Sequence, residues 1–336
     1  MKKSLIALAT MSAFAGAAFA QSNVQLYGIV DAGVEHVSSG GVSTTKMESG
    51  IQSGSRFGVK GSEDLGGGLT AKFQMEQGVK VDNGAAADAT KAFSRQAWLG
   101  VASKDMGEVR LGRQNAPIRG VVEAVDPFSI GLAGSALKFV ADGSIVERTD
   151  NAVTYLSPSM SGFQAQVQYG MGETTQSTTT NGYLGLSATY SSGPLMVAAA
   201  YAKQKTNLVP ADEKETAWVL GGTYDFGVAK AHVAFVEGKF EDNVAVTSDK
   251  ARNYLLGVSK SVGSHNVMAS YIDSDIRTVA DADSKTFALG YTYSLSKRTN
   301  LYTSYARTSN DANATLGGAA AGESISKYNL GVRHQF

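Results

Sequence analysis

The sequence predicts an all-β protein whose strands form one closed antiparallel transmembrane β-barrel, and three observations lead to this prediction. Segments of about ten residues alternate between apolar and polar side chains, which is the period of a strand with one face in lipid. Aromatic residues recur at the ends of the apolar faces, where the girdles of a membrane barrel lie. The connections alternate between short turns and long polar links, which indicates an up-and-down meander of roughly 16 strands.

The composition agrees with a fold of many strands and excludes several classes of function. The 336 residues include 38 glycines, 14 tyrosines and 5 prolines, and the 30 basic side chains balance the 30 acidic ones. Because there is no cysteine, the chain has no disulfide and no thiol nucleophile. Its 4 histidines include no His-Glu-x-x-His pair, which leaves little for a metal site. Because the formal charge is zero, we expect no nucleic acid as a partner. We also expect no cofactor and no metal.

Residues 1–20 are predicted to be a signal peptide that is removed from the mature protein. Residues 2 and 3 are lysines, residues 5–14 are mainly apolar, and residues 18–20 read Ala-Phe-Ala, which fits the cleavage pattern. The alternatives are an apolar core helix or a membrane anchor. The apolar stretch is shorter than the roughly 18 residues that suggest a membrane-spanning helix. Residues 21–336 then form the barrel.

The predicted strands follow one another through the rest of the chain. In the first, Val24, Leu26 and Val30 share one face at period two, and Asp31 and Glu35 lie on the other. The alternation recurs in the segments 163–169, 195–201, 218–226, 254–258, 267–271, 287–293 and 328–336. Short turns are expected at 62–68, 103–107, 157–162, 191–194, 225–227, 261–264 and 294–298. Long links are expected at 37–50, 78–91, 172–181, 203–214, 240–251, 273–284 and 309–324.

A soluble β-sandwich or β-helix would show the same local alternation, with the apolar face turned inward. The length of the strands, their aromatic ends and the regular change between short and long links favour the membrane barrel instead. A solenoid needs a fixed repeat period, and the sequence has none.

One segment, residues 115–144, breaks this rhythm. It separates strand signals at 109–114 and 147–157, and a loop of about 30 residues in a compact fold is usually functional. Its apolar content, which includes Phe128 and Ile130, argues against a disordered external loop. We expect this segment to fold into the lumen of the barrel.

Taken in order, these segments resemble the Gram-negative general porins over essentially the whole mature chain. The matching motifs are Val-Gln-Leu-Tyr-Gly at 24–28, Ser-Arg-Phe-Gly-Val-Lys-Gly-Ser-Glu-Asp-Leu-Gly-Gly-Gly at 55–68, Arg-Gln-Ala-Trp-Leu-Gly at 95–100, Val-Arg-Leu-Gly-Arg-Gln at 109–114 and Tyr-Asn-Leu-Gly-Val-Arg-His-Gln-Phe at 328–336. That family implies a 16-stranded outer-membrane barrel with short periplasmic turns, long external loops and a third loop that folds inward. Residues 115–144 match that loop in place and size. The family often has Pro-Glu-Phe-Gly-Gly at the tip of this loop, whereas residues 126–131 here read Asp-Pro-Phe-Ser-Ile-Gly.

The resemblance implies an outer-membrane porin through which small hydrophilic solutes and ions diffuse passively. It also implies the partners: two further copies in a homotrimer, outer-membrane lipid and lipopolysaccharide, the diffusing solutes and ions, and the barrel-assembly machinery. In this family the machinery reads a C-terminal aromatic residue during assembly. Here that assembly signal is Phe336.

Constrictions of this kind set basic side chains on the wall against acids on the loop, and strand parity suggests which residues these are. Phe57 faces lipid by parity, so Arg56 and Lys60 face the lumen. The same argument turns Arg110 and Arg148 inward. The expected basic wall is therefore Arg56, Arg95, Arg148, Lys60 and Arg110.

Arg95 is the exception, because its parity with Leu99 directs it toward lipid unless a bulge intervenes. We still expect it in the lumen, since a charge facing lipid at mid-depth costs about 2–4 kcal/mol and porins carry a wall arginine in this motif. The expected opposing acids lie on the loop and are Glu123, Asp126 and Asp142. Since three wall arginines are expected closer to the narrowest point than the acids, we expect a modest preference for anions.

Three other functions are less well supported. A substrate-specific outer-membrane sugar channel would carry a run of aromatics along the lumen, and the loop offers only Phe128 and Phe139. An outer-membrane lipase or protease would bring His, Ser and Asn or Asp together at one rim, but the histidines fall on separate segments. An adhesin or anchor protein would have a plugged lumen. We therefore expect a channel and not an enzyme.

Overall fold

The computed structural model describes residues 23–138, 146–172, 182–208, 211–242 and 247–336, so the predicted signal peptide and Asp142 lie outside the described residues. The strands are β1 (Asn23–Ser39), β2 (Val42–Ser49), β3 (Arg56–Gly66), β4 (Leu69–Gly78), β5 (Gln96–Ser103), β6 (Gly107–Asn115), β7 (Arg148–Leu156), β8 (Phe163–Gly170), β9 (Tyr183–Ser192), β10 (Leu195–Leu208), β11 (Ala211–Asp225), β12 (Lys230–Asp242), β13 (Thr247–Val262), β14 (His265–Ile276), β15 (Ser284–Ser294), β16 (Thr299–Asn310) and β17 (Ile325–Gln335). The helical pieces are α2 (Pro117–Val125), η1 (Ala136–Lys138) and η3 (Leu316–Gly318). Within the described residues, no helix is both long and apolar enough to cross a membrane.

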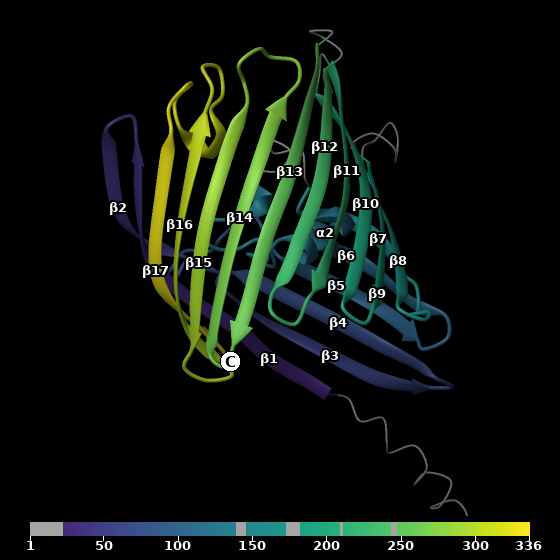
Figure 1. The fold of residues 1–336 in the computed structure, drawn as a ribbon. Helices are drawn as coiled ribbons and strands as arrows, with labels where there is room; N and C mark the ends of the chain where they lie inside the picture. The colour runs from purple at the N-terminus through teal and green to yellow at the C-terminus, as the bar shows by residue number, and fades with distance from the viewer. Residues whose placement is uncertain (1–22, 139–145, 173–181, 209–210, 243–246) are drawn as a thin grey trace, which may run out of the picture.

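The strands close into one antiparallel barrel (Figure 1). Strand β1 pairs with β17 in the register that sets Ile29 opposite Gln335, and this pairing joins the two ends of the sheet. On its other edge β1 pairs with β2, where Ala32 lies opposite Ser49, and then with β3, where Ile29 lies opposite Arg56. Strands β2 and β3 are therefore two halves of one barrel strand. The 17 labelled strands make the 16-stranded barrel that the sequence predicts.

Each strand turns one face outward and one face inward. In β15, Phe287 and Leu289 are exposed whereas Ala288 between them is fully buried. In β1, Leu26 is 68% exposed whereas Asp31 is completely buried. Large apolar side chains that point outward, with polar ones inside, are the reverse of a soluble sandwich and match a lipid-facing barrel. The predicted membrane barrel is confirmed.

Several strands run further than their apolar alternation predicts. The links expected at 37–50 and 203–214 are largely strand, because β1 and β2 meet at a turn of two glycines and β10 runs to Leu208 before β11 starts at Ala211. Beyond the membrane both faces of a hairpin meet water, so the backbone ladder continues while the apolar alternation stops. The alternation therefore marks only the lipid-facing part of each strand.

The segment between β6 and β7 folds into the lumen, as the sequence predicts. Figure 1 shows α2 inside the ring of strands, where it packs against β9, β10 and β11. Its apolar side chains meet small apolar residues of the inner wall and form one buried cluster with Ile118, Val121, Val122, Ala198, Ala200, Ala217 and Val219 among its members. The apolar core of this protein is thus the layer between the loop and the wall that it covers.

Candidate functional site

The loop between β6 and β7 follows the inner wall and narrows the lumen. After α2 it passes β15 and β16, where Phe128 lies over Gly290 and the N–H of Ala133 bonds Ser304 Oγ at 3.0 Å. A Cβ atom at Gly290 would lie 2.6 Å from the Phe128 ring, so a glycine there leaves the loop room to lie flat. Because the loop packs on β9 to β13, β15 and β16, we expect the remaining opening on the other side of the loop, along the wall of β3 to β7.

The tip of this loop is fastened to the break between β2 and β3. The N–H of Leu132 bonds the carbonyl oxygen of Ile51 at 2.7 Å. The break is held in turn by the fully buried Asp31, whose carboxylate accepts the N–H of Gln52 at 2.9 Å and the hydroxyl of Tyr302 at 2.6 Å. The interrupted strand therefore gives the loop a fixed anchor across the lumen.

Asp126 shapes the loop tip and does not face the opening, which corrects its predicted place among the acids of the constriction. It is 2% exposed, and its carboxylate accepts the N–H groups of Phe128 at 3.0 Å and of Ile130 and Ala136 at 2.9 Å. Ile130 and Leu132 adopt left-handed φ angles of 57° and 59°, which cost roughly 1–2 kcal/mol for each residue with a Cβ. Burial raises the pKa of Asp126 to about 6, although the three N–H donors act in the opposite direction.

Three of the predicted wall arginines come together beside the opening, and we call them the arginine cluster: Arg56 at the start of β3, Arg95 just before β5 and Arg148 at the start of β7. Arg95 is the charge that acts most strongly on each of the other two. Its Nε bonds Glu76 Oε1 at 2.7 Å, and Arg56 Nη1 lies 3.9 Å from the same oxygen. One carboxylate thus contacts two of the three guanidinium groups.

Arg95 reaches the lumen because it precedes the strand whose parity would turn it outward. Strand β5 begins at Gln96, and within it Leu99 and Val101 are exposed on the lipid side. Arg95 itself lies in a bend, where its backbone N–H bonds the carbonyl oxygen of Glu76 at 3.1 Å. The side chain is therefore free of the strand's alternation, and no bulge is needed to bring it inside.

Among the described residues, three that form ion pairs with the arginine cluster or with Glu123 are not among those predicted: Glu76, Arg119 and Glu147. Arg119 on α2 bonds Glu123 at 2.8 Å, and its Nε lies 3.7 Å from Glu147, which also lies 3.4 Å from Arg148. The predicted acid Glu123 is at the site, with its side chain 45% exposed. Two signals could have found Glu76 and Arg119. Parity in β4 turns Glu76 inward, and the i,i+4 spacing of Arg119 and Glu123 is helical.

Lys60 and Arg110 lie on the inner wall, nearer the turn ends than the arginine cluster, and their part in the constriction stays a prediction. The Nζ of Lys60 lies 5.1 Å from the centre of the Tyr27 ring. The guanidinium of Arg110 lies 4.3 Å from the centre of the Trp98 ring, and its Nε bonds Glu108 at 2.6 Å. These contacts hold both cations against the wall, away from the loop.

Phe336 completes the closing seam of the barrel. Its backbone N–H and carbonyl each bond Gly28 at 3.1 Å. A Cβ atom at Gly28 would lie 2.3 Å from the Phe336 ring, so the ring covers this glycine. Its role as an assembly signal stays a prediction.

Comparisons with known proteins agree with this geometry. The sequence profile of a family described as Gram-negative porin matches residues 5–313. Outer membrane porin protein 32 of Delftia acidovorans is 35% identical over 358 residues, and an outer membrane porin protein of Bordetella pertussis is 32% identical over 396 residues; each match covers 100% of both chains. Among solved structures, an anion-selective porin from Comamonas acidovorans superposes with a TM-score of 0.84 at 32% identity, covering 94% of this chain and 100% of that one. The trimer form of OmpT from Vibrio cholerae has a TM-score of 0.72 at 19% identity, covering 94% and 99% of the two chains, and shows the fold alone.

Proposed function

Because this chain belongs to the Gram-negative porin family, whose members form passive diffusion channels in the outer membrane, we propose that its own channel prefers small anions and that the arginine cluster sets this preference. The observation that carries the proposal is that two carboxylates serve four guanidinium groups: Glu76 contacts Arg56 and Arg95, and Glu147 contacts Arg119 and Arg148. The description of the Comamonas relative as anion-selective supports it.

The balance of charge at the opening gives the expected size of the effect. Among the described residues there, the arginine cluster and Arg119 contribute four positive charges, and Glu76, Glu123 and Glu147 contribute three negative ones. Arg113 and Arg333 lie near the cluster as well, and each is opposed by an acid, Asp150 and Asp31 respectively. Asp126 is turned into the loop, away from passing ions. Charges that line a narrow pore act on an ion through little water, so a single excess positive charge favours anions. The preference is modest because most of the field cancels.

We propose a homotrimer as the working assembly and a channel without catalytic activity. The trimer is supported by membership of the porin family, whose members assemble as oligomers. The absence of catalysis is supported by the family and by the histidines, which lie on β1, β12, β14 and β17. We also propose that residues 1–20 are removed on export, which leaves 21–336 as the mature barrel.

Neutralising part of the arginine cluster tests the proposal. The double variant Arg56→Gln, Arg148→Gln should shift the zero-current potential in a salt gradient toward cation preference, because the net charge at the opening falls from +1 to −1. The shift should be larger at 0.1 M salt than at 1 M, since the screening length falls from about 10 Å to about 3 Å. Planar-bilayer recordings measure this potential directly.

The matched control is Arg298→Gln, which removes one positive charge from an exposed turn between β15 and β16. This variant should keep the zero-current potential of the unmodified protein. An unchanged potential in the double variant would show that Arg56 and Arg148 do not line the constriction.

A further inference from the structure

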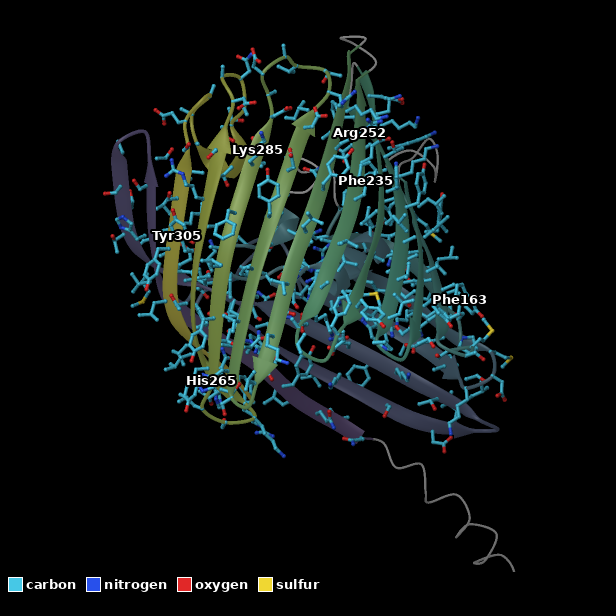
Figure 2. The ribbon with its side chains drawn as sticks, in the orientation of Figure 1. Phe163, Phe235, Arg252, His265, Lys285 and Tyr305 are labelled. Atoms are coloured by element: carbon cyan, nitrogen blue, oxygen red, sulfur yellow. The ribbon has the colours of Figure 1, made fainter. Side chains whose placement is uncertain are left out.

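A pocket opens in the inner wall of β1, β3, β4 and β5, between the arginine cluster and the short turns. We call it the turn-side pocket, and its lining includes Gln25, Lys60, Ser62, Lys72, Gln74 and Trp98. It lies toward the end of the barrel at which His265 is labelled in Figure 2. Its volume is about 220 Å³, which is smaller than the roughly 300–1,000 Å³ of pockets for drug-sized ligands. The pocket therefore suits a solute the size of a single sugar ring.

The strand register brings the lining residues together on the inner face. Four of them form a row across the wall: Gln25, Lys60, Gln74 and Trp98. The next row toward the turns pairs Ser62 with Lys72. Gln25 and Gln74 lie an even number of positions from Asp31 and Glu76, which are buried on the inner side of the same strands. These side chains therefore face the lumen, where a passing solute can reach them.

The turn-side pocket follows the arginine cluster along the same wall. Lys60 lies four residues beyond Arg56 on β3, which is roughly 13 Å along the strand. Hydrogen bonds connect the two sites, because the Tyr27 hydroxyl donates to Glu76 at 3.0 Å and accepts Gln74 Nε2 at 2.6 Å. A solute that moves from the cluster toward the turns along this wall therefore passes the pocket.

Positive charge in the pocket is only partly neutralised. Lys60 forms no ion pair within 4.0 Å with an acid in the described part of the chain, and its Nζ lies 5.1 Å from the centre of the Tyr27 ring. Lys72 Nζ donates to Glu108 at 3.0 Å, but the same carboxylate also accepts Arg110 Nε at 2.6 Å. The two lysines can therefore donate charge-assisted hydrogen bonds to a carboxylate of a solute.

The uncharged part of the lining distinguishes one kind of anion from another. The side-chain amides of Gln25 and Gln74 and the hydroxyl of Ser62 each offer both donors and acceptors. Chloride or a simple carboxylate has no donor for the amide oxygens, whereas an anion with hydroxyl groups both donates and accepts. Trp98 adds aromatic surface beside these groups, against which the C–H bonds of a sugar ring can pack. Charge and hydrogen-bonding capacity together match an anion that also carries several hydroxyl groups.

We propose that the turn-side pocket binds small hydroxycarboxylates, such as sugar acids. The carboxylate lies between Lys60 and Lys72, and the hydroxyl groups bond to the amides of Gln25 and Gln74. This inference rests on the proposed preference for anions and names a class of anion that the channel retains longest. Successive weak sites of this kind let a solute enter a pore and still leave it.

Block of the chloride current by added solutes tests the inference in planar-bilayer recordings. Glucuronate carries a carboxylate and hydroxyl groups, glucose carries only hydroxyl groups, and acetate carries only the carboxylate. In symmetrical 0.1 M KCl, glucuronate should bind roughly 10-fold more tightly than either of the other two solutes, because it alone satisfies both the lysines and the amides. The concentration that halves the current gives the dissociation constant of each solute.

Two variants separate the two halves of the site. Lys60→Gln should weaken the binding of glucuronate roughly 10-fold and leave glucose unchanged, since only the carboxylate loses its partner. Gln25→Leu should weaken glucuronate roughly 3-fold and leave acetate unchanged, since only a hydroxyl loses its partner. The matched control is Lys104→Gln, which removes a cation from an exposed turn at the same end of the barrel and should bind glucuronate normally. Heat-modifiable migration on a gel shows that each variant is a folded barrel.

Three results would overturn the inference: equal binding of glucuronate and acetate, equal binding of glucuronate and glucose, or unchanged binding of glucuronate by Lys60→Gln. None of these results depends on the zero-current potential in a salt gradient, which tests the arginine cluster. If that potential showed no preference for anions while Lys60→Gln still weakened glucuronate, the proposed function would fail and the pocket would stand. If the potential showed the preference and glucuronate bound no better than acetate, only the pocket would fail.

Discussion

At the scale of single residues, Glu76 positions two members of the arginine cluster, Arg56 and Arg95. It is 5% exposed on the inner face of β4, where it accepts hydrogen bonds from Arg95 Nε at 2.7 Å and from the Tyr27 hydroxyl at 3.0 Å. Gln74 donates to the Tyr27 oxygen at 2.6 Å and holds the phenol in place. A buried carboxylate with these partners fixes the direction of the guanidinium while it cancels part of the positive charge.

Replacing Glu76 by Gln should strengthen the preference for anions, because the variant keeps the shape of the side chain and loses its negative charge. A unit charge about 8 Å from an ion changes its energy by roughly 0.5–2 kcal/mol at an effective dielectric constant of 80 to 20. The anion-to-cation permeability ratio should therefore rise by a factor of about two or more. The zero-current potential in a salt gradient measures the ratio, with Glu63→Gln in an exposed part of β3 as the control. A shift toward cations would contradict this account of Glu76.

At the scale of elements, the inward loop shows what the sequence reveals and what it hides. Its length, place and apolar content predict that it enters the lumen, and the structure confirms this. The orientation of Asp126 could not be predicted, because its three partners are backbone N–H groups. Every residue except proline has such a group, so the sequence does not show which of them bind the carboxylate. The direction of Arg95 was also hidden, since strand parity cannot say where a strand begins. The alternation of apolar and polar residues predicts which face of the barrel wall a side chain occupies, but only within the hydrogen-bonded part of a strand.

The stability of the loop tip should depend on pH through Asp126. The pKa of this carboxyl rises from its ordinary value of 3.8 to about 6 on burial, so the folded loop binds more protons than the open one between these values. The contribution of Asp126 to the closed loop is therefore greatest below about pH 4 and falls as the pH rises through 6. Protection factors for the amides of Phe128, Ile130 and Ala136, corrected for intrinsic exchange, should fall by up to roughly 100-fold over this range.

The variant Asp126→Asn cannot titrate, and its amide oxygen still accepts backbone N–H groups, so its protection factors should lose this pH dependence. Asp105→Asn, in an exposed turn between β5 and β6, should keep the pH dependence of the unmodified protein. If Asp126→Asn showed the same slope between pH 4 and 6 as the unmodified protein, another group would have to be the titrating one.

At the scale of the whole molecule, the sequence predicts the barrel, its strand number and its outward apolar face. The break between β2 and β3 could not be predicted, because the residues that leave the ladder there are held by Asp31 and Tyr302, and these two lie 271 positions apart. Residues that come into contact only when the barrel closes are far apart in the sequence, so no short sequence pattern predicts their contact. The same limit applies to the contact between Leu132 and Ile51 that anchors the loop.

Deleting Phe336 should lower the yield of folded barrel, because the residue supplies two backbone hydrogen bonds to Gly28 and its ring covers that glycine at the seam. Each buried hydrogen bond contributes roughly 0.5–1.5 kcal/mol. The fraction of heat-modifiable protein in outer-membrane preparations measures the yield. Phe336→Tyr keeps the ring and the backbone and should assemble normally, and wild-type yield from the deletion would contradict the prediction.

The seam between β1 and β17 also determines when a growing chain can fold, because the barrel cannot close before β17 has been synthesised. Ile29 in β1 pairs with Gln335 in β17, so of the described strands the one synthesised last completes the hydrogen bonding of the one synthesised first. Pairing across such a sequence separation is slow to find, since the chain must bring its two ends together before any contact there forms. A product that lacks its final strand would leave two open edges of unpaired backbone groups in hydrocarbon, each costing several kcal/mol. A chain whose synthesis stops before β17 therefore cannot close into a smaller pore and should be degraded.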